Sequence, residues 1–205
     1  MKCLIIAAHM KDKIRDLVNP DDYGFIICAD NSFVLAEQEG IHPDLVIGDF
    51  DHEPEVDYSS LTCEVIRLPA VKDDTDTHYC IKEAISRGMK DLSIIGGTGG
   101  RLDHTLANIQ SLVFACKNGA QAILIDKKNI VTVTDKNAEL TKNKKYLSVL
   151  AVGGKAIVSI EGCKYSPEEI ELTESFPVGV SNEICSKMAH IHVIQGTVVL
   201  IQSDD

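Results

Sequence analysis

Residues 91–125 read DLSIIGGTGGRLDHTLANIQSLVFACKNGAQAILI and carry the clearest structural signal in the chain. Two short apolar runs, at 92–95 and 122–125, flank a longer stretch at 102–117 in which apolar residues recur at helical spacing. Gly119 follows that stretch, at the position where a left-handed residue commonly ends a helix. The order strand, helix, strand predicts one unit of a parallel sheet covered by helices.

The same alternation extends back to the start of the chain. Further strands are predicted at 3–8, 25–29, 45–47 and 64–68, and further helices at 11–18, 32–39 and 75–87. We therefore expect residues 1–126 to form an α/β domain with an open, mostly parallel sheet.

The pattern changes after residue 126. Short runs rich in Val, Ile and Thr show no helical period, at 130–134, 146–152, 155–160, 189–194 and 197–201. Gly153-Gly154 and Gln195-Gly196 join neighbouring runs as hairpin turns. We expect residues 127–145 to be a connecting region and residues 146–205 to form a small all-β sandwich domain.

Charge and composition exclude several classes of protein. The chain has 205 residues, with 20 Lys and Arg against 31 Asp and Glu, and a formal net charge of −11. A nucleic-acid binder needs clustered basic residues, so this balance argues against one. No run approaches the roughly 20 apolar residues of a membrane helix. The seven cysteines are scattered without a CxxC pair, which predicts a reducing, cytoplasmic location.

Acidic residues follow several predicted strands. Asp30 follows the run 25–29, Asp49 and Asp51 follow 45–47, and Asp73, Asp74 and Asp76 come after 64–68. Ligands of open α/β sheets bind beyond the carboxyl ends of the strands, and carboxylate oxygens suit a hard cation such as Mg²⁺. Each acid also has a plainer interpretation, as a solvated charge or a helix cap: Asp30 for the helix near Ser32, and Asp74 or Asp76 for the one near Thr75. Caps do not explain the added pair Asp49 and Asp51.

A glycine-rich turn follows the strand at 92–95. Residues 96–101 read GGTGGR and lead directly into the helix at 102–117. Glycines let the backbone approach a ligand, the N–H groups of a helix start favour phosphate, and Arg101 adds a fork of donors. The turn matches neither a Walker A loop nor GxGxxG. Acids and turn together indicate a site for a nucleoside triphosphate with Mg²⁺ and transfer of a phosphorus group, and the residues alone indicate no narrower class.

Five segments carry a resemblance to a known family. They are Pro43-Asp44 with Gly48-Asp49-Phe50-Asp51, Lys72-Asp73-Asp74-Thr75-Asp76, residues 96–104 with Asn108, Gly162-Cys163-Lys164-Tyr165, and Gly179-Val180-Ser181-Asn182-Glu183. In order and spacing they resemble the thiamine pyrophosphokinase (thiamin diphosphokinase) family over nearly the whole chain. The resemblance implies transfer of the pyrophosphoryl group of ATP to the hydroxyl of thiamine, with release of AMP. It also implies a homodimer with thiamine bound where two subunits meet.

The resemblance implies that residues 1–126 are the catalytic domain, which binds ATP and a metal ion, and that residues 146–205 are the thiamine-binding domain. It also assigns roles to individual residues. Mg²⁺ ligands would be Asp30, Asp49, Asp51 and Asp76. The ATP site would comprise Lys72, Asp73, Gly96, Gly97, Thr98, Gly99, Gly100, Arg101, Asp103, His104 and Asn108. Asp73, Asp76 and Arg101 would be catalytic, with Asp73 or Asp76 accepting the proton of the thiamine hydroxyl. Tyr165 would stack on the pyrimidine ring, which Ser181 and Asn182 would contact. From the residues alone, Tyr165 is a core residue and Ser181-Asn182 a turn.

Two departures and two alternatives stay open at this stage. Asn31 and Ser32 stand where the family often has two glycines, and a backbone conformation with positive φ would be more strained at Ser32 than at glycine. His52 replaces a small hydroxyl residue beside Asp51. The alternative enzyme is a metal-dependent phosphohydrolase, in which the same acids would activate water. The alternative without catalysis is a nucleotide or thiamine sensor.

Overall fold

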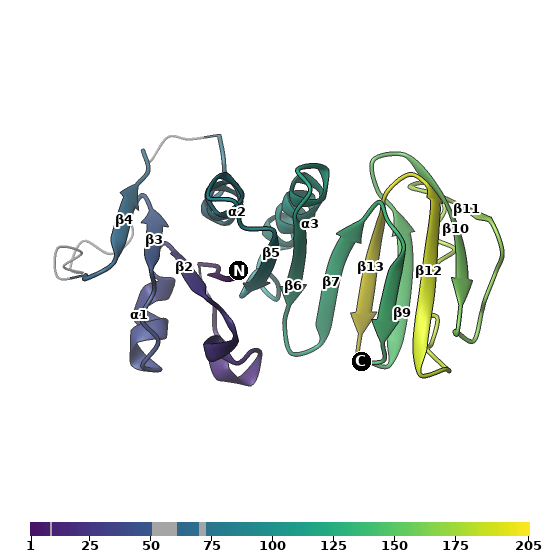
Figure 1. Ribbon diagram of the computed structural model, residues 1–205, viewed down its shortest axis with the longest axis horizontal. Helices are drawn as coiled ribbons and strands as arrows, with labels where there is room; N and C mark the ends of the chain where they lie inside the picture. Colours follow the sequence, from purple (N-terminus) through teal and green to yellow (C-terminus); the bar gives the residue numbers. More distant parts are fainter. Residues whose placement is uncertain (9, 51–60, 70–72) are drawn as a thin grey trace. The chain divides into compact units, whose positions relative to one another are not determined.

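The computed structural model describes residues 1–8, 10–50, 61–69 and 73–205. Internal contacts divide the chain into two units, residues 1–127 and 128–205. Each unit is built around its own strands (Figure 1).

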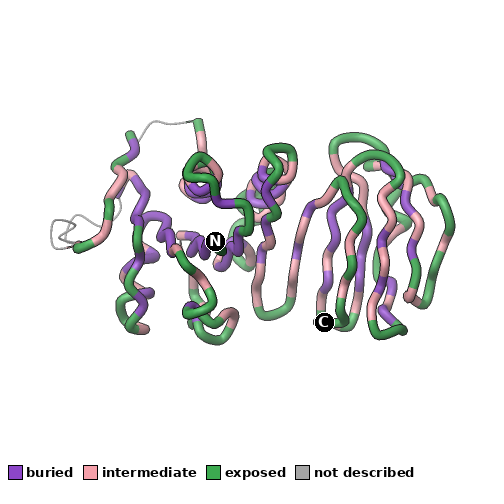
Figure 2. The backbone as a smooth tube through the Cα atoms, in the orientation of Figure 1, coloured by how far each residue is buried: buried purple, intermediate pink, exposed green. Residues whose placement is uncertain are grey.

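The described part of the first unit contains six strands. In spatial order they are β4 (Glu64–Arg67), β3 (Leu45–Gly48), β2 (Phe25–Ala29), β1 (Lys2–Ile6), β5 (Asp91–Ile95) and β6 (Gln121–Ile125). Every neighbouring pair in this row is parallel. Strands β1, β2, β3 and β5 are buried almost throughout, as expected where both faces of a parallel sheet are covered (Figure 2). The predicted open, mostly parallel sheet is confirmed.

Three α-helices accompany these strands in the described residues. Helix α1 (Ser32–Gln38) packs through Phe33 and Ala36 into a cluster with residues of β1, β2 and β3. Helices α2 (Asp76–Ser86) and α3 (Leu102–Lys117) lie against each other, and α2 also contacts β1, β2 and β3 (Figure 1). Asp76 at the start of α2 and Arg101 just before α3 line one cavity.

The helix predicted at 11–18 does not form, and the segment contains only a 3-10 turn, Ile14–Asp16. The turn is held from outside instead. The carboxylate of Glu39 accepts hydrogen bonds from the backbone N–H of Ile14 and Arg15, at 2.8 and 3.2 Å. Because Ile14 is fully buried, this bonding anchors the segment without a helix.

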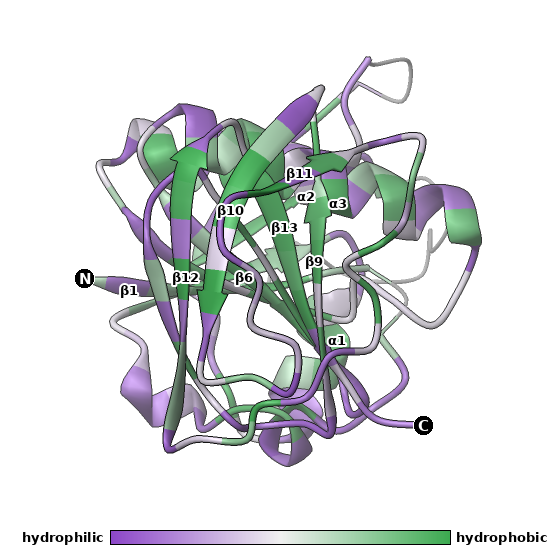
Figure 3. Cartoon of the chain, turned by 90° about the vertical axis from the view of Figure 1, so that its right-hand side faces the viewer, coloured by the Kyte–Doolittle hydropathy of each residue, from purple (hydrophilic) through white to green (hydrophobic). Residues whose placement is uncertain are grey.

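The second unit is antiparallel throughout its described pairs. Strands β7 (Asn129–Thr134), β13 (Val198–Ser203) and β9 (Tyr146–Ala151) pair in that order, and a separate four-stranded sheet holds β11 (Ile170–Thr173), β10 (Lys155–Glu161), β12 (Met188–Gln195) and β8 (Ala138–Thr141). Apolar side chains of both sheets form one core, including Leu147, Val149, Val158, Ile191 and Leu200. Hydrophobic stretches run along these strands (Figure 3). The predicted β-sandwich is confirmed.

The boundary between the units differs from the prediction. Residues 127–145, expected to be a connection, contain β7 and β8, so the second unit begins at residue 128. Strands β8 and β11 were not predicted, because four residues such as AELT are too short to show an alternating pattern. Among the helices that the structure describes, none combines the length and apolar character needed to cross a membrane.

Candidate active site

A cavity of about 730 Å³ lies at the carboxyl ends of the parallel strands of the first unit. It is lined by most of the residues that the sequence singled out, namely Asp30, Asp49, Asp76, Gly96, Gly97, Thr98, Gly99, Gly100, Arg101, His104 and Asn108. Its other lining residues were not predicted and include Met10, Asp12, Thr75, Thr77 and Asp126. The two groups of motif residues, acids and glycine turn, therefore share one site.

Asp30 stands directly after β2 in a constrained position. It is 5% exposed, its φ is +49°, and its N–H donates to the carbonyl of Ile47 at 2.7 Å. A Cβ added to Gly48 would lie 2.8 Å from the Asp30 Cα and 3.0 Å from its Oδ1. Glycine at position 48 therefore lets the end of β3 approach the Asp30 carboxylate closely. The register of β2 and β3 pairs Ala29 with Ile47, which places Gly48 beside Asp30 and Asp49 one residue further on at the neighbouring strand end.

The positive φ in this turn falls on Asp30 and not on Ser32. Ser32 is the first residue of α1, and its hydroxyl donates to the carbonyl of Ile6 at 2.9 Å. Ser32 therefore carries no backbone strain from a positive φ. Aspartate tolerates the left-handed region better than most residues, which is compatible with its place in the turn.

The acids are not the helix caps that the plainer interpretation required. Asn31 is the N-cap of α1, and Thr75 is the N-cap of α2, where its hydroxyl accepts from the N–H of His78 at 3.2 Å. Asp76 is the first residue of α2, its Oδ1 is buried, and it lines the cavity. Asp74 is instead bound to Lys82 at 2.6 Å, an ion pair that lowers the Asp74 pKa.

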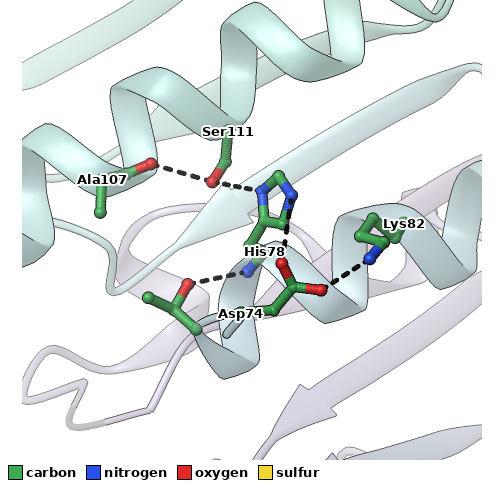
Figure 4. A network of polar contacts seen from close by, with 6 residues as sticks. Asp74, His78, Lys82, Ala107 and Ser111 are labelled. Atoms are coloured by element: carbon green, nitrogen blue, oxygen red, sulfur yellow. Dashed lines mark hydrogen bonds and ion pairs between the residues drawn. The ribbon is translucent and has the colours of Figure 1, made fainter. Parts of the chain in front are cut away.

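A polar network holds α2 beside α3 (Figure 4). The hydroxyl of Ser111 donates to the carbonyl of Ala107 at 2.9 Å, so the 2.9 Å contact with His78 Nδ1 places the ring proton on that nitrogen. Burial lowers the pKa of His78, which agrees with a neutral ring. Asp74 lies 3.9 Å from His78 Nε2 on the other side. The network fixes the first turn of α2, and with it Asp76, relative to α3.

Asn108 of α3 and Leu124 of β6 pack closely against the glycine turn. The amide of Asn108, 8% exposed, donates to the carbonyl of Gly97 at 2.7 Å. A Cβ on Gly97 would lie 2.6 Å from Leu124 Cδ1, and Gly96 and Gly99 have φ of +78° and +79°. The turn therefore needs glycine for packing at 97 and for backbone conformation at 96 and 99. Asn108 shapes this turn through α3.

Arg101 and Asp103 form an exposed pair at the start of α3. The Arg101 Nε and Nη2 donate to the two carboxylate oxygens of Asp103, at 3.1 and 2.5 Å. Arg101 is the N-cap residue of α3 and lines the cavity, whereas Asp103 does not line it. The guanidinium and its hydrogen bonds hold the pKa of Asp103 below its usual value.

Some predicted residues are not brought together in this cavity. Asp73 is exposed and does not line it. Asp51, His52 and Lys72 lie outside the described residues. Asp44 lies at the opposite, amino ends of the strands, where its carboxylate accepts a hydrogen bond from the N–H of Ile26 at 2.8 Å.

The contact between Thr98 and Asp126 was not predicted from the sequence and is seen only in the structure. The Thr98 hydroxyl donates to the carboxylate of Asp126, which follows β6 and lines the cavity. The rule that pointed to Asp30 and Asp49, an acid directly after a buried strand, applies equally to Asp126. That rule is the signal that could have found it.

The donor set fits Mg²⁺ shared with a substrate. Among the described side chains, no three of Asp, Glu, His or Cys converge closely enough to hold an ion by themselves. Mg²⁺ is usually held by one or two carboxylates together with substrate phosphates. Asp30 and Asp49 at neighbouring strand ends supply such a pair of hard oxygen ligands, and Asp76 lines the same cavity.

Tyr165 in the second unit is exposed and not a core residue. Its exposed fraction is 64%, and its backbone is held by the side chain of Asn182, which accepts from the Tyr165 N–H at 3.0 Å and donates to its carbonyl at 2.6 Å. Asn182 is itself buried, and Ser181 beside it has a φ of +60°. Exposed apolar residues occur in the same segment, at Phe176, Val178 and Val180. The Asn182 amide thus positions a solvent-facing aromatic ring.

Comparison with known proteins gives consistent matches over both units. A family model described as "Thiamin pyrophosphokinase, catalytic domain" matches residues 19–125, and one described as "Thiamin pyrophosphokinase, vitamin B1 binding domain" matches residues 129–198. The chain is 29% identical over 209 residues to thiamine pyrophosphokinase of Bacillus subtilis, covering 98% of each chain.

Solved structures agree with these matches. The crystal structure of the Bacillus subtilis protein superposes with a TM-score of 0.86 at 26% identity, covering 99% of each chain. That of a thiamin pyrophosphokinase family protein from Enterococcus faecalis superposes with a TM-score of 0.87 at 25% identity, covering 100% of each chain.

Proposed function

The chain belongs to the thiamin pyrophosphokinase family and transfers a pyrophosphoryl group from ATP to thiamine, and on this premise we propose that its active site is the cavity at the carboxyl ends of β2, β3 and β5. One observation carries the proposal. Two carboxylates at neighbouring strand ends, Asp30 and Asp49, share a cavity with a glycine turn and Arg101. Oxygen ligands for a cation and donors for phosphate are what a triphosphate substrate needs.

We propose that Asp30, Asp49 and Asp76 hold Mg²⁺, together with Asp51, which lies outside the described residues. When bound, this ion supplies charge neutralisation for the triphosphate and orients it. The backbone of the turn Gly96, Gly97, Thr98, Gly99 and Gly100 approaches the phosphates, and Arg101 binds oxygens on which negative charge develops. Lys72, Asp73, His104 and Asn108 complete the proposed ATP site, and Asp103 acts there through Arg101, which it holds by two hydrogen bonds.

In the transfer, the thiamine hydroxyl oxygen forms a bond to the β-phosphorus of ATP. The bond between that phosphorus and the oxygen bridging to the α-phosphorus breaks, and AMP leaves with this oxygen. Asp73 or Asp76 accepts the hydroxyl proton. Such transition states are loose and depend mainly on positioning and charge stabilisation, so we assign the larger effects to Arg101 and the metal-binding acids.

The decisive assay follows the products of ATP with thiamine and Mg²⁺. We expect AMP and thiamine diphosphate in equal amounts, measured by ion-exchange chromatography. ADP with thiamine monophosphate would overturn pyrophosphoryl transfer. Phosphate released without thiamine would indicate the phosphohydrolase, and thiamine binding without any product, measured by calorimetry, would indicate the sensor.

We propose that thiamine binds at Tyr165, with Ser181 and Asn182 at the same site, and that the protein is a homodimer with this site between subunits. Tyr165 presents an exposed ring whose backbone Asn182 fixes. Exposed Phe176, Val178 and Val180 offer an apolar surface that a second copy would cover. Sedimentation equilibrium should give twice the mass of the chain.

The cytoplasmic location stays a prediction.

Tyr165 also offers a direct test of thiamine stacking, because the chain contains no tryptophan. We expect the Tyr165→Trp variant to show fluorescence that thiamine quenches with saturation. We expect Tyr165→Ala to raise the KM for thiamine about tenfold, the scale of one aromatic stacking contact, while the KM for ATP stays unchanged. A Tyr23→Trp variant, with its reporter beside the amino end of β2, controls for non-specific quenching. Equal quenching in both tryptophan variants would contradict stacking at Tyr165.

A further inference from the structure

Asp126 lines the active-site cavity but has no role in the proposed binding of Mg²⁺, phosphate or thiamine. It follows β6 directly, is half-buried, and lines the same cavity as Asp30 and the glycine turn. The hydroxyl of Thr98, from that turn, donates to its carboxylate. The Thr98 proton is therefore committed to Asp126 and is not directed at a phosphate.

The sheet order separates Asp126 from the proposed metal ligands. Strands β1 and β5 lie between β2, which Asp30 follows, and β6, which Asp126 follows. Three strand spacings of about 4.8 Å place the two strand ends about 14 Å apart. Two oxygens bound to one Mg²⁺ lie within about 4 Å of each other. Asp126 therefore cannot share the ion that Asp30 and Asp49 would hold.

The chemistry of Asp126 suits hydroxyl groups and not phosphate. A carboxylate accepts hydrogen bonds at both oxygens, with about four acceptor positions, so Asp126 can accept from a ligand hydroxyl in addition to Thr98. Phosphate oxygens carry negative charge and would be repelled. In nucleotide-binding α/β folds, a carboxylate at a strand end commonly binds ribose hydroxyls. Asp12, which also lines the cavity, is already paired with Lys127 at 2.7 Å.

We propose that Asp126, oriented by Thr98, binds the ribose hydroxyls of ATP and makes the enzyme select ribonucleotides over deoxyribonucleotides. The inference rests on the proposed ATP site. The triphosphate then extends along the strand ends from β3 and β2 toward the glycine turn, and the ribose reaches β6. Thr98 becomes a positioning residue that acts through Asp126.

The test compares kcat/KM for ATP, 2′-deoxyATP and 3′-deoxyATP at saturating thiamine. We expect the unmodified enzyme to favour ATP at least about tenfold over one or both analogues, the scale of a hydrogen bond to a charged group. Asp126→Ala should reduce this preference to within about twofold while still using the deoxy analogue, which shows that the variant is folded. Thr98→Val should reduce the preference partly. Asp12→Ala, the matched cavity carboxylate, should leave it unchanged.

Three results would overturn the inference. The unmodified enzyme could use ATP and both analogues equally. Asp126→Ala could lower kcat/KM by the same factor for all three nucleotides, which would indicate a structural role. Asp126→Ala could instead change the ratio between ATP and inosine triphosphate, which would place Asp126 at the base amino group. In each case formation of AMP and thiamine diphosphate by the unmodified enzyme leaves the proposed function intact, whereas its absence would refute that function.

Discussion

Asp30→Asn is expected to lower kcat at least about 100-fold and to leave the metal-free protein as stable as before, or more stable. The loss follows because a buried carboxylate at the end of β2 is proposed to hold Mg²⁺ against the triphosphate. The stability result follows from charge. Asp30 and Asp49 lie at neighbouring strand ends, and asparagine at position 30 removes one of the two negative charges there.

Asparagine is the informative replacement at this position. It has the size of aspartate and tolerates the left-handed backbone that a φ of +49° requires, so the turn can persist without its charge. Thermal unfolding should show the midpoint of the unmodified protein rising with Mg²⁺ and ATP, and that of Asp30→Asn staying constant. Kinetic assays of AMP release measure the accompanying loss of kcat.

Asp91→Asn is the matched control, because Asp91 is an exposed carboxylate at the opposite, amino end of β5. It should keep full activity and the rise in melting temperature with Mg²⁺ and ATP. An Asp30→Asn variant that retains that rise would contradict the metal assignment. A variant that melts well below the unmodified protein without ligand would show that Asp30 is retained for stability and not for binding.

The strands and the acidic strand ends were predictable because their signals are local. Apolar runs such as that of β2 match a buried parallel strand in length and composition, and Asp30 and Asp49 follow such runs directly. Asp126 follows β6 in the same way but was missed, because no motif surrounds it in the sequence. Its role emerges only when the sheet order places β6 beside β5 and Thr98 bonds to it.

Other features depend on contacts between distant residues. The buried amide of Asn182 holds the backbone of Tyr165, 17 residues earlier, and no spacing rule predicts that pairing. Leu102 and Leu106 fit the apolar stripe of α3 yet are 73% and 55% exposed, whereas Leu112 of the same stripe is buried. Helical periodicity indicates which residues share a face, but only the packed structure shows how far along the helix that face is covered.

Arg101→Lys is expected to lower kcat/KM about 1,000-fold, mainly through kcat. A guanidinium offers a planar fork of donors to two phosphate oxygens, and arginines that stabilise phosphoryl transfer contribute factors of this order. Lysine keeps the charge but presents a single point donor, so it should keep ATP binding within about tenfold of normal. The comparison therefore separates geometry at the transition state from simple attraction of charge, and initial-rate kinetics across ATP concentrations measure both.

Asp103 supplies the contrasting variant, because it holds Arg101 through two hydrogen bonds without lining the cavity. Arg101 and Asp103 are 75% and 61% exposed, and an ion pair so exposed contributes little to stability because water screens it. Exchanging Asp103 for phosphate oxygens as the partner of Arg101 therefore costs little, and Asp103→Asn should change kcat/KM less than about fivefold. If Asp103→Asn proved as damaging as Arg101→Lys, the carboxylate would itself have to contact ATP or thiamine, and Arg101 would lose its place as the principal donor to the transferred group.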